Sequence, residues 1–171
     1  MTTIVTDGLS IAADGQSTSG SEITRTRSQK ILVRHGRVYA FCGGTAIREA
    51  LIAWHHAGAD PATYPVVDDK FAATMLVLEA PMRGTYYATE VRRPDPVEFP
   101  FAMGTGQDFA TGAVLAGASV QRAVEIASLR DIYTGGEITV VDIAAALKPA
   151  KRTPRAKASQ DKVIKFRNKA A

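Results

Sequence analysis

Short apolar runs broken by turn residues mark the first forty positions of the chain as β-structure. Asp7-Gly8 separates two such runs, and this pair is typical of a tight turn between antiparallel strands. His35-Gly36 separates two more runs in the same way. Between the two hairpins, residues 16–27 are rich in Ser, Thr and Gly, which predicts a loop or an irregular strand. The expected strands are residues 3–6, 9–13, 31–33 and 37–42.

Helical spacing begins after the glycine pair at 43–44. Apolar residues recur there at helical intervals, and Thr45 is placed to cap the helix that they define. The pattern predicts a helix that exposes Arg48 and Glu49 and ends near Gly58. The apolar side of this helix consists of Ile47, Leu51, Ile52 and Trp54.

The rest of the chain predicts a further hairpin, a strand, two helices and a last strand. Residues 59–70, with prolines and paired aspartates, are expected to form a loop. An order of strands, helix, strands, two helices and strand favours two antiparallel sheets packed together with helices outside. The expected elements are strands 74–78, 85–91 and 99–103, helices 107–118 and 120–130, and strand 138–143.

Charge divides the chain into two regions. Nine of the 21 Lys and Arg residues, but only one of the 17 Asp and Glu residues, lie in residues 148–171. The net charge of +4 therefore belongs to this tail, and the body of the chain is acidic. We expect one domain, residues 1–147, large enough to bury a core, followed by a basic and flexible tail, residues 148–171.

Composition also excludes several classes of protein. No apolar stretch is long enough to cross a bilayer, and the first fifteen positions lack the basic segment of a secretory signal. The single cysteine, Cys42, cannot form an internal disulfide, and its apolar neighbours indicate a core position. His35, His55 and His56 lack the spacing of metal ligands. We therefore expect a cytoplasmic protein that uses no metal or cofactor and does not bind a membrane.

The candidate nucleophile is Thr2. Removal of Met1 would leave this residue with both a free α-amine and a hydroxyl, and the amine can act as the base for the hydroxyl. Asp14 and Lys30 follow, sixteen positions apart. Each has a simpler explanation when taken alone, because Asp14 stands in an Asp-Gly turn and Lys30 is the kind of residue usually found solvated.

Six motifs, taken in order, resemble those of the proteasome β-subunit family of N-terminal-nucleophile hydrolases, which includes HslV. The motifs are Thr-Thr-Ile-Val at 2–5, Ala-Asp-Gly-Gln-Ser-Thr-Ser-Gly at 13–20, Lys30, Phe-Cys-Gly-Gly-Thr-Ala at 41–46, Gly-Thr-Gly-Gln-Asp-Phe-Ala at 104–110, and Arg-Asp-Ile-Tyr-Thr-Gly-Gly at 130–136. Their order and spacing carry the resemblance, which is strongest to the compact bacterial proteasome homologues. It implies an α+β fold, the αββα four-layer sandwich of these hydrolases.

The chain departs from the family pattern in four places. Its first hairpin is short, and threonine replaces serine at positions 105 and 134. Only a loop stands between Gly58 and the strand expected at Thr74, where the family has its second helix, so we expect a reduced helical layer. The basic tail, residues 148–171, lies outside the pattern.

The resemblance implies a threonine-type endopeptidase. The Thr2 hydroxyl would attack the scissile carbonyl and form an acyl-enzyme, while its own α-amine handles the proton. Lys30 would lie close as a cation and Asp14 would orient it. The backbone amide of Gly43 would stabilise the oxyanion, although a glycine here also serves to end a strand. The residues expected around the amine and hydroxyl of Thr2 are Thr105, Asp131 and Thr134.

Peptide substrate is expected to bind as an added strand between the segments of Thr18 and Thr45. By resemblance, Phe41 indicates a restricted apolar pocket, and Glu49 indicates a preference for a basic side chain. The pocket for the residue before the cut would be lined by Ser17, Ser28, Phe41, Thr45 and Glu49.

The resemblance also implies a homo-oligomer of stacked hexameric or heptameric rings that encloses the sites and receives unfolded protein or peptides. An ATPase unfoldase, if one takes part, must be a separate protein, because the chain has no ATP-binding motif. The basic tail has four explanations: solubilising disorder, an insertion into the chamber, a regulator-binding segment, or non-specific attraction to nucleic acid. Specific recognition of nucleic acid is not expected.

Three alternatives to the peptidase remain open. The first is a ring-forming scaffold that has kept the fold and lost catalysis. The second is an amidase or acyltransferase on the same fold. The third is a nucleic-acid-associated assembly protein that acts through its tail.

Overall fold

The computed structural model describes residues 2–65, 72–88 and 94–148. It begins with the hairpin predicted around Asp7-Gly8, which joins β1 (Thr3–Thr6) to β2 (Ser10–Ala13). The Asp7 carboxylate accepts the backbone amides of Leu9 and Ser10, so the turn is closed by its own side chain. This hairpin is the centre of a four-stranded antiparallel sheet in the order β10-β1-β2-β11, with β10 at Phe101–Gly104 and β11 at Thr139–Asp142.

A second sheet has five antiparallel strands in the order β5-β6-β7-β8-β9. The hairpin expected around His35-Gly36 forms its first two strands, and the hairpin expected around residues 81–84 forms the next pair. The strands are β5 (Ile31–Arg34), β6 (Arg37–Gly43), β7 (Ala73–Ala80), β8 (Arg83–Tyr87) and β9 (Pro94–Pro96). A separate two-stranded ribbon consists of β3 (Ser17–Ser19) and β4 (Glu22–Arg25).

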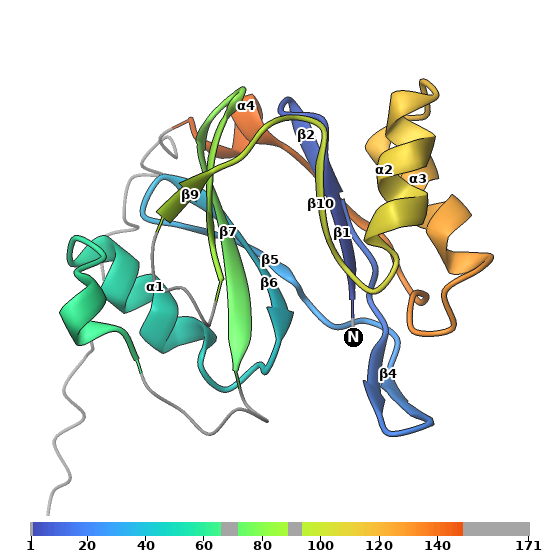
Figure 1. Ribbon diagram of the computed structural model, residues 1–171, viewed down its shortest axis with the longest axis horizontal. Coiled ribbons are helices and arrows are strands. Elements are labelled where there is room, and N and C mark those ends of the chain that lie inside the picture. The colour runs from blue at the N-terminus through green and yellow to red at the C-terminus, as the bar shows by residue number, and fades with distance from the viewer. Residues whose placement is uncertain (1, 66–71, 89–93, 149–171) are drawn as a thin grey trace, which may run out of the picture.

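Helices cover both outer faces of the paired sheets. In Figure 1, α1 (Arg48–His56) lies outside the five-stranded sheet, and α2 and α3 lie outside the four-stranded sheet at the opposite side of the molecule. Helix α2 spans Gln107–Leu115 and helix α3 spans Val120–Ser128. Ser119 caps α3, because its hydroxyl accepts the backbone amide of Arg122. The predicted αββα sandwich is therefore the observed α+β architecture.

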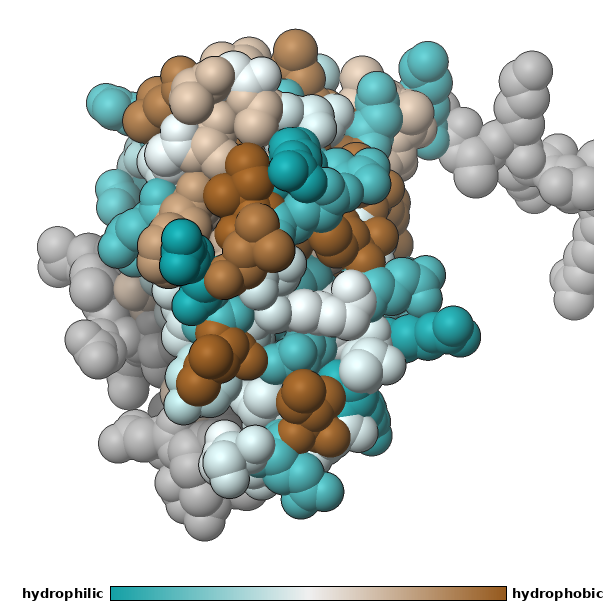
Figure 2. Space-filling model, turned by 90° about the vertical axis from the view of Figure 1, so that its right-hand side faces the viewer, coloured by the Kyte–Doolittle hydropathy of each residue, from teal (hydrophilic) through white to brown (hydrophobic). Residues whose placement is uncertain are grey.

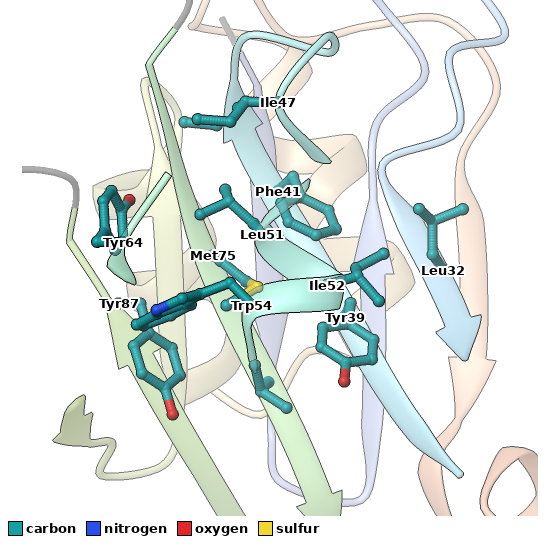
Figure 3. Close-up of a cluster of buried hydrophobic side chains, with 12 residues drawn as sticks. Leu32, Tyr39, Phe41, Ile47, Leu51, Ile52, Trp54, Tyr64, Met75 and Tyr87 are labelled. Atoms are coloured by element: carbon teal, nitrogen blue, oxygen red, sulfur yellow. The ribbon is translucent and has the colours of Figure 1, made fainter. Parts of the chain in front are cut away.

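These layers form because the side chains along each strand point alternately to its two faces. Successive side chains of a strand point to opposite faces, so Ile4 packs between the sheets and Val5 packs under α2 and α3. In β6, Ala40 faces the other sheet while Tyr39 and Phe41 face α1. Figure 3 shows the cluster under α1, where the Trp54 ring meets the edges of two tyrosine rings. The full cluster is Leu32, Tyr39, Phe41, Ile47, Leu51, Ile52, Trp54, Tyr64, Ala73, Met75, Val77 and Tyr87.

The helical layer over the five-stranded sheet is reduced, as expected. Among the described residues between α1 and β7, the only helical element is the single turn η1 (Pro61–Thr63). Residues 66–71 of the loop expected there lie outside the described residues, as do residues 89–91 of a predicted strand and nearly all of the predicted tail.

Three details of the sequence prediction were wrong. The first helix begins at Arg48 rather than at Thr45, and the residue before it, Ile47, makes no side-chain capping bond. Arg48 is buried, because it lies four positions before Ile52 on the same face of α1. The last strand ends at Asp142, whose carboxylate accepts the amide of Ala145 at 2.7 Å and so starts the short helix α4 (Ile143–Ala146).

Candidate active site

Thr2 stands directly before β1, beside the last strand of the same sheet. Its carbonyl accepts the backbone amide of Thr105 at 2.9 Å, and Thr2 lines a cleft. The neighbouring Gly104 has φ +99°, and a Cβ atom there would collide with the Thr2 carbonyl. The glycine-containing turn after β10 therefore fits closely around Thr2. Figure 1 marks this end of the chain between the two sheets.

Asp14 and Lys30 form a buried ion pair next to Thr2. Lys30 Nζ lies 2.7 Å from Asp14 Oδ1, and the two side chains retain only 2% and 0% of their solvent exposure. Asp14 Oδ1 also accepts the backbone amide of Thr3 at 2.8 Å, which ties the pair to the residue after the candidate nucleophile. Asp14 Oδ2 accepts the amides of Gln16 at 3.1 Å and Gly135 at 3.2 Å. The sixteen-residue spacing thus brings the two charges together.

Burial changes the proton affinity of the lysine. Removal of Lys30 from water lowers its pKa below the usual value, and the Asp14 carboxylate opposes that shift by favouring the ammonium. Cys42 lies in the same neighbourhood, and burial raises the pKa of its thiol to about 12. The thiol is therefore protonated and is no competing nucleophile at neutral pH.

Asp131 joins three threonine hydroxyls into one network. Its Oδ2 accepts the hydroxyls of Thr105 at 2.5 Å and Thr134 at 2.6 Å, and its Oδ1 accepts the amide of Tyr133. The Thr134 hydroxyl also lies 2.5 Å from that of Thr3. Burial alone would raise the pKa of Asp131, but the hydrogen bonds from Thr105, Thr134 and Tyr133 outweigh it and lower that pKa.

The cleft beside Thr2 has a volume of about 640 Å³. Gly43, at the end of β6, lines it with φ +98°, a left-handed conformation that glycine adopts without strain. The β3–β4 ribbon forms another part of its wall. The lining residues are Thr2, Ser17, Thr18, Ser19, Thr24, Arg25, Lys30, Gly43, Gly44, Thr45, Arg48 and Ala72.

Of the predicted substrate-binding residues, Ser17, Thr18 and Thr45 line this cleft. Ser28 contacts it indirectly, since its hydroxyl lies 2.6 Å from that of Ser17. Phe41 is instead fully buried in the cluster under α1 (Figure 3), and Glu49 is exposed; neither lines the cleft.

Arg48 is a cleft residue that the sequence analysis missed. Its side chain is 9% exposed, Nη1 donates to the carbonyl of Gln29 at 2.6 Å, and the guanidinium carbon lies 5.7 Å from the centre of the Phe41 ring. The i,i+4 relation between Arg48 and Ile52 was a signal that could have placed this arginine on the buried face. Arg25, Ser19 and Thr24 were also missed, because nothing local indicates that the β3–β4 ribbon folds toward Thr2.

The described residues contain no group of three or more His, Cys, Asp or Glu side chains that could hold a metal ion. None of the described helices is long and apolar enough to span a membrane. The chemistry available at the cleft is therefore that of a threonine, a buried lysine–aspartate pair and a hydroxyl network around an aspartate.

The two packed sheets with helices outside form the α+β fold found in HslV- and proteasome-like subunits. Comparison with solved structures shows the same fold in HslV from Trypanosoma brucei, which is 19% identical with a TM-score of 0.63 over 82% of this chain and 97% of that one. BPH from Thiobacillus denitrificans is 18% identical with a TM-score of 0.57, over 84% of this chain and 98% of that one.

A second structure of Thiobacillus denitrificans BPH, in complex with epoxomicin, is 16% identical with a TM-score of 0.59 and covers 84% of this chain and 98% of that one. No protein-family model and no curated protein matches this sequence. At these identities the likeness establishes the fold, and the chemistry rests on the site itself.

Proposed function

We propose that this chain is a threonine-type peptidase subunit that cleaves peptide bonds through an acyl-enzyme on Thr2, which becomes N-terminal when Met1 is removed. The observation that carries the proposal is the buried Asp14–Lys30 pair, which is hydrogen-bonded to the amide of Thr3 at the edge of a cleft large enough for a peptide. Its structural neighbours include BPH, which was determined with epoxomicin bound. Epoxomicin is a peptide epoxyketone, so it gives an experimental probe for the same chemistry.

The reaction proceeds in two halves. In the first, Thr2 Oγ1 forms a bond to the scissile carbonyl carbon and its proton passes to the Thr2 α-amine. The tetrahedral intermediate then collapses, the carbon–nitrogen bond breaks, and the same proton goes to the leaving amine. In the second half, a water molecule attacks the ester carbonyl carbon and gives a proton to the α-amine. The bond between the acyl carbon and Oγ1 then breaks, the amine returns the proton to Oγ1, and the carboxylic acid product leaves.

Lys30 and Asp14 set the electrostatics of these steps. The ammonium of Lys30 stabilises negative charge that develops on Thr2 Oγ1, because a cation in a dry site acts strongly over a short distance. Asp14 holds Lys30 in place and favours its charged form, which opposes the lowering of the Lys30 pKa by burial. Positioning of the cation and retention of its charge are thus two functions of one contact.

The oxyanion of the intermediate is assigned to the backbone amide of Gly43, at the end of β6 and on the wall of the cleft. One such donor is worth roughly 3–4 kcal/mol of transition-state stabilisation in other acyl-transfer enzymes. The Asp131 network includes Thr3, which follows Thr2 in the chain, and Thr105, whose amide bonds to the Thr2 carbonyl, so it holds the backbone around Thr2. The Asp131 carboxylate stabilises the positive charge that forms on the Thr2 α-amine.

Substrate binds in an extended conformation between the β3–β4 ribbon and the segment after β6. Ser17 and Thr18 lie on one wall of the cleft and Thr45 on the other. Backbone hydrogen bonds of an added strand supply affinity that is independent of sequence, which suits unfolded protein as a substrate.

The peptidase acts as a homo-oligomer of stacked hexameric or heptameric rings. Figure 2 shows apolar side chains gathered on the face of the molecule that α2 and α3 form. A patch of this kind on a soluble chain marks an interaction surface. Exposed large apolar residues of this region are Phe109, Leu115, Leu129 and Ile132, the last with 78% exposure.

Hydrolysis of an internally quenched peptide tests this proposal. Wild-type protein should cleave it, Thr2→Ala should reduce cleavage by at least about a thousandfold, and Thr2→Ser should retain activity. The exposed Thr139 of β11 gives a matched control, since Thr139→Ala lies outside the cleft. Cleavage of small acyl amides but not of peptides would favour an amidase, and absence of both activities with Met1 removed would favour an idle scaffold.

A further inference from the structure

Arg48 is a buried cation with no acidic partner among the residues that the structure describes. Buried charges in proteins are normally paired with an opposite charge, because an isolated ion loses its hydration without compensation. The other buried cation of the site, Lys30, follows this rule and is paired with Asp14. Within the described residues, the polar contact of the Arg48 guanidinium is the neutral carbonyl of Gln29, and its Nε atom is buried with no hydrogen-bond acceptor.

The neighbouring residues hold this guanidinium in place but do not satisfy all of its hydrogen-bond donors. Its flat face lies over the Phe41 ring, and Nη1 is fixed by Gln29, so the side chain is positioned before any ligand arrives. A guanidinium has five N–H donors in a fixed fork that matches the geometry of a carboxylate. The arrangement resembles an anion receptor more than a structural ion pair.

The rest of the cleft favours the same kind of ligand. Arg25 and Arg48 line it together with Lys30, and no Asp or Glu is among the described residues of its wall. Because the charge of Lys30 is balanced by Asp14, the two arginines leave a positive charge on the described part of the cleft wall. A ligand with a basic side chain would be repelled there, and one with a carboxylate would be attracted.

We propose that Arg48 selects peptides with an aspartate or glutamate side chain immediately before the scissile bond. Arg48, the first residue of α1, lines the same cleft as Thr2, and its guanidinium is held by the carbonyl of Gln29, so a substrate bound at Thr2 shares the cleft with this cation. The inference rests on the proposed peptidase function and names its substrate class. It replaces the preference for a basic residue that Glu49 had suggested, since Glu49 does not line the cleft.

The test uses four blocked peptide epoxyketones that differ only in the residue next to the warhead: Asp, Asn, Leu or Lys. The rate of adduct formation on Thr2 is followed by intact mass. Asn matches the shape of Asp without its charge, so the Asp/Asn ratio isolates the electrostatic contact. We expect the Asp probe to react at least about tenfold faster than the Asn probe, and the Lys probe to be slowest.

Two variants assign the effect to Arg48. Arg48→Gln should bring the Asp/Asn ratio to within about twofold, and Arg48→Lys should keep part of the preference, because it retains the charge without the fork. Arg34→Gln is the control that removes an exposed positive charge outside the cleft, and it should keep the wild-type ratio. If Arg48→Gln fails to fold, the wild-type and Arg48→Lys ratios still decide the question.

The outcomes separate this inference from the function on which it rests. Modification of Thr2 with equal Asp and Asn rates, or with the Leu or Lys probe fastest, would overturn the acidic specificity and leave the peptidase intact. An Asp/Asn ratio that survives in Arg48→Gln would also overturn the role of Arg48. Failure of all four probes to modify Thr2, with Met1 removed, would overturn the peptidase itself.

Discussion

The energetics of single residues at this site are dominated by Asp14 and Lys30, whose charges have almost no contact with solvent. Two buried charges lose their hydration, and their attraction and hydrogen bonds only offset that loss. Removal of one partner leaves the other uncompensated, which costs far more than removal of both. The pair is therefore a point where stability and the proposed catalysis depend on the same atoms.

Replacement of Lys30 by methionine should destabilise the fold by about 3–5 kcal/mol, because Asp14 is left buried without a counter-charge. The double variant Asp14→Asn/Lys30→Met should recover a large part of that loss, while both remain inactive. Urea unfolding measures the free energies, with the exposed Lys148→Met as the control, expected within about 0.5 kcal/mol of wild type. Equal stability of the Lys30 variant and wild type would mean that the pair is solvated.

Asp131 gives a prediction with a defined pH dependence. Its pKa is lower in the folded protein, so the stability that its carboxylate contributes is complete above the unfolded-state pKa and is lost as the pH falls through the folded-state value. We expect Asp131→Asn to cost about 1–3 kcal/mol at neutral pH. That difference from wild type should shrink below about pH 4.

Urea unfolding of both proteins between pH 7 and pH 3 measures this difference. Asp95→Asn, an exposed position on β9, serves as the control. A difference that grows as the pH falls would contradict the proposed network.

At the scale of elements, the turn between β10 and α2 shows how glycine lets a backbone segment approach the candidate active site. A Cβ atom at Gly106 would meet the hydroxyl oxygens of Thr3 and Thr134, whereas one at Gly112, in the middle of α2, would meet nothing within 4 Å. We expect Gly106→Ala to slow probe labelling of Thr2 by at least about tenfold, because it displaces two members of the Asp131 network.

Gly112→Ala is the matched substitution in the same segment. It should leave labelling unchanged and stabilise the protein by about 0.5–1 kcal/mol, since alanine has the higher helix propensity. Labelling rates and thermal unfolding of both variants check this pair. Equal effects at positions 106 and 112 would show that the turn is not coupled to the site.

Local sequence predicted most of these elements, and its failures have physical causes. The turns at Asp7-Gly8 and His35-Gly36 were predictable because two residues define them. The start of α1 was not, because Thr45 has the chemistry of a cap while tertiary packing sets the first helical residue at Arg48. The proline-containing β9 was missed because proline disfavours a strand interior, and an edge strand tolerates it.

At the scale of the whole molecule, the grouping of strands and helices predicted the four layers, because each sheet must bury one face on the other and one under helices. The Asp14–Lys30 contact was expected from the family resemblance. The contact between Thr3 and Thr134 was not, since 131 residues separate these positions and only the closed sandwich brings them together.

The intact mass of the purified protein after treatment with a peptide epoxyketone, measured beside that of Thr2→Ala, tests the proposed N-terminal nucleophile most directly. We predict loss of Met1 and one adduct per chain in the wild type, with no adduct in the variant. A chain that has lost Met1 and takes up no adduct, or an adduct that persists in Thr2→Ala, would contradict an N-terminal threonine nucleophile.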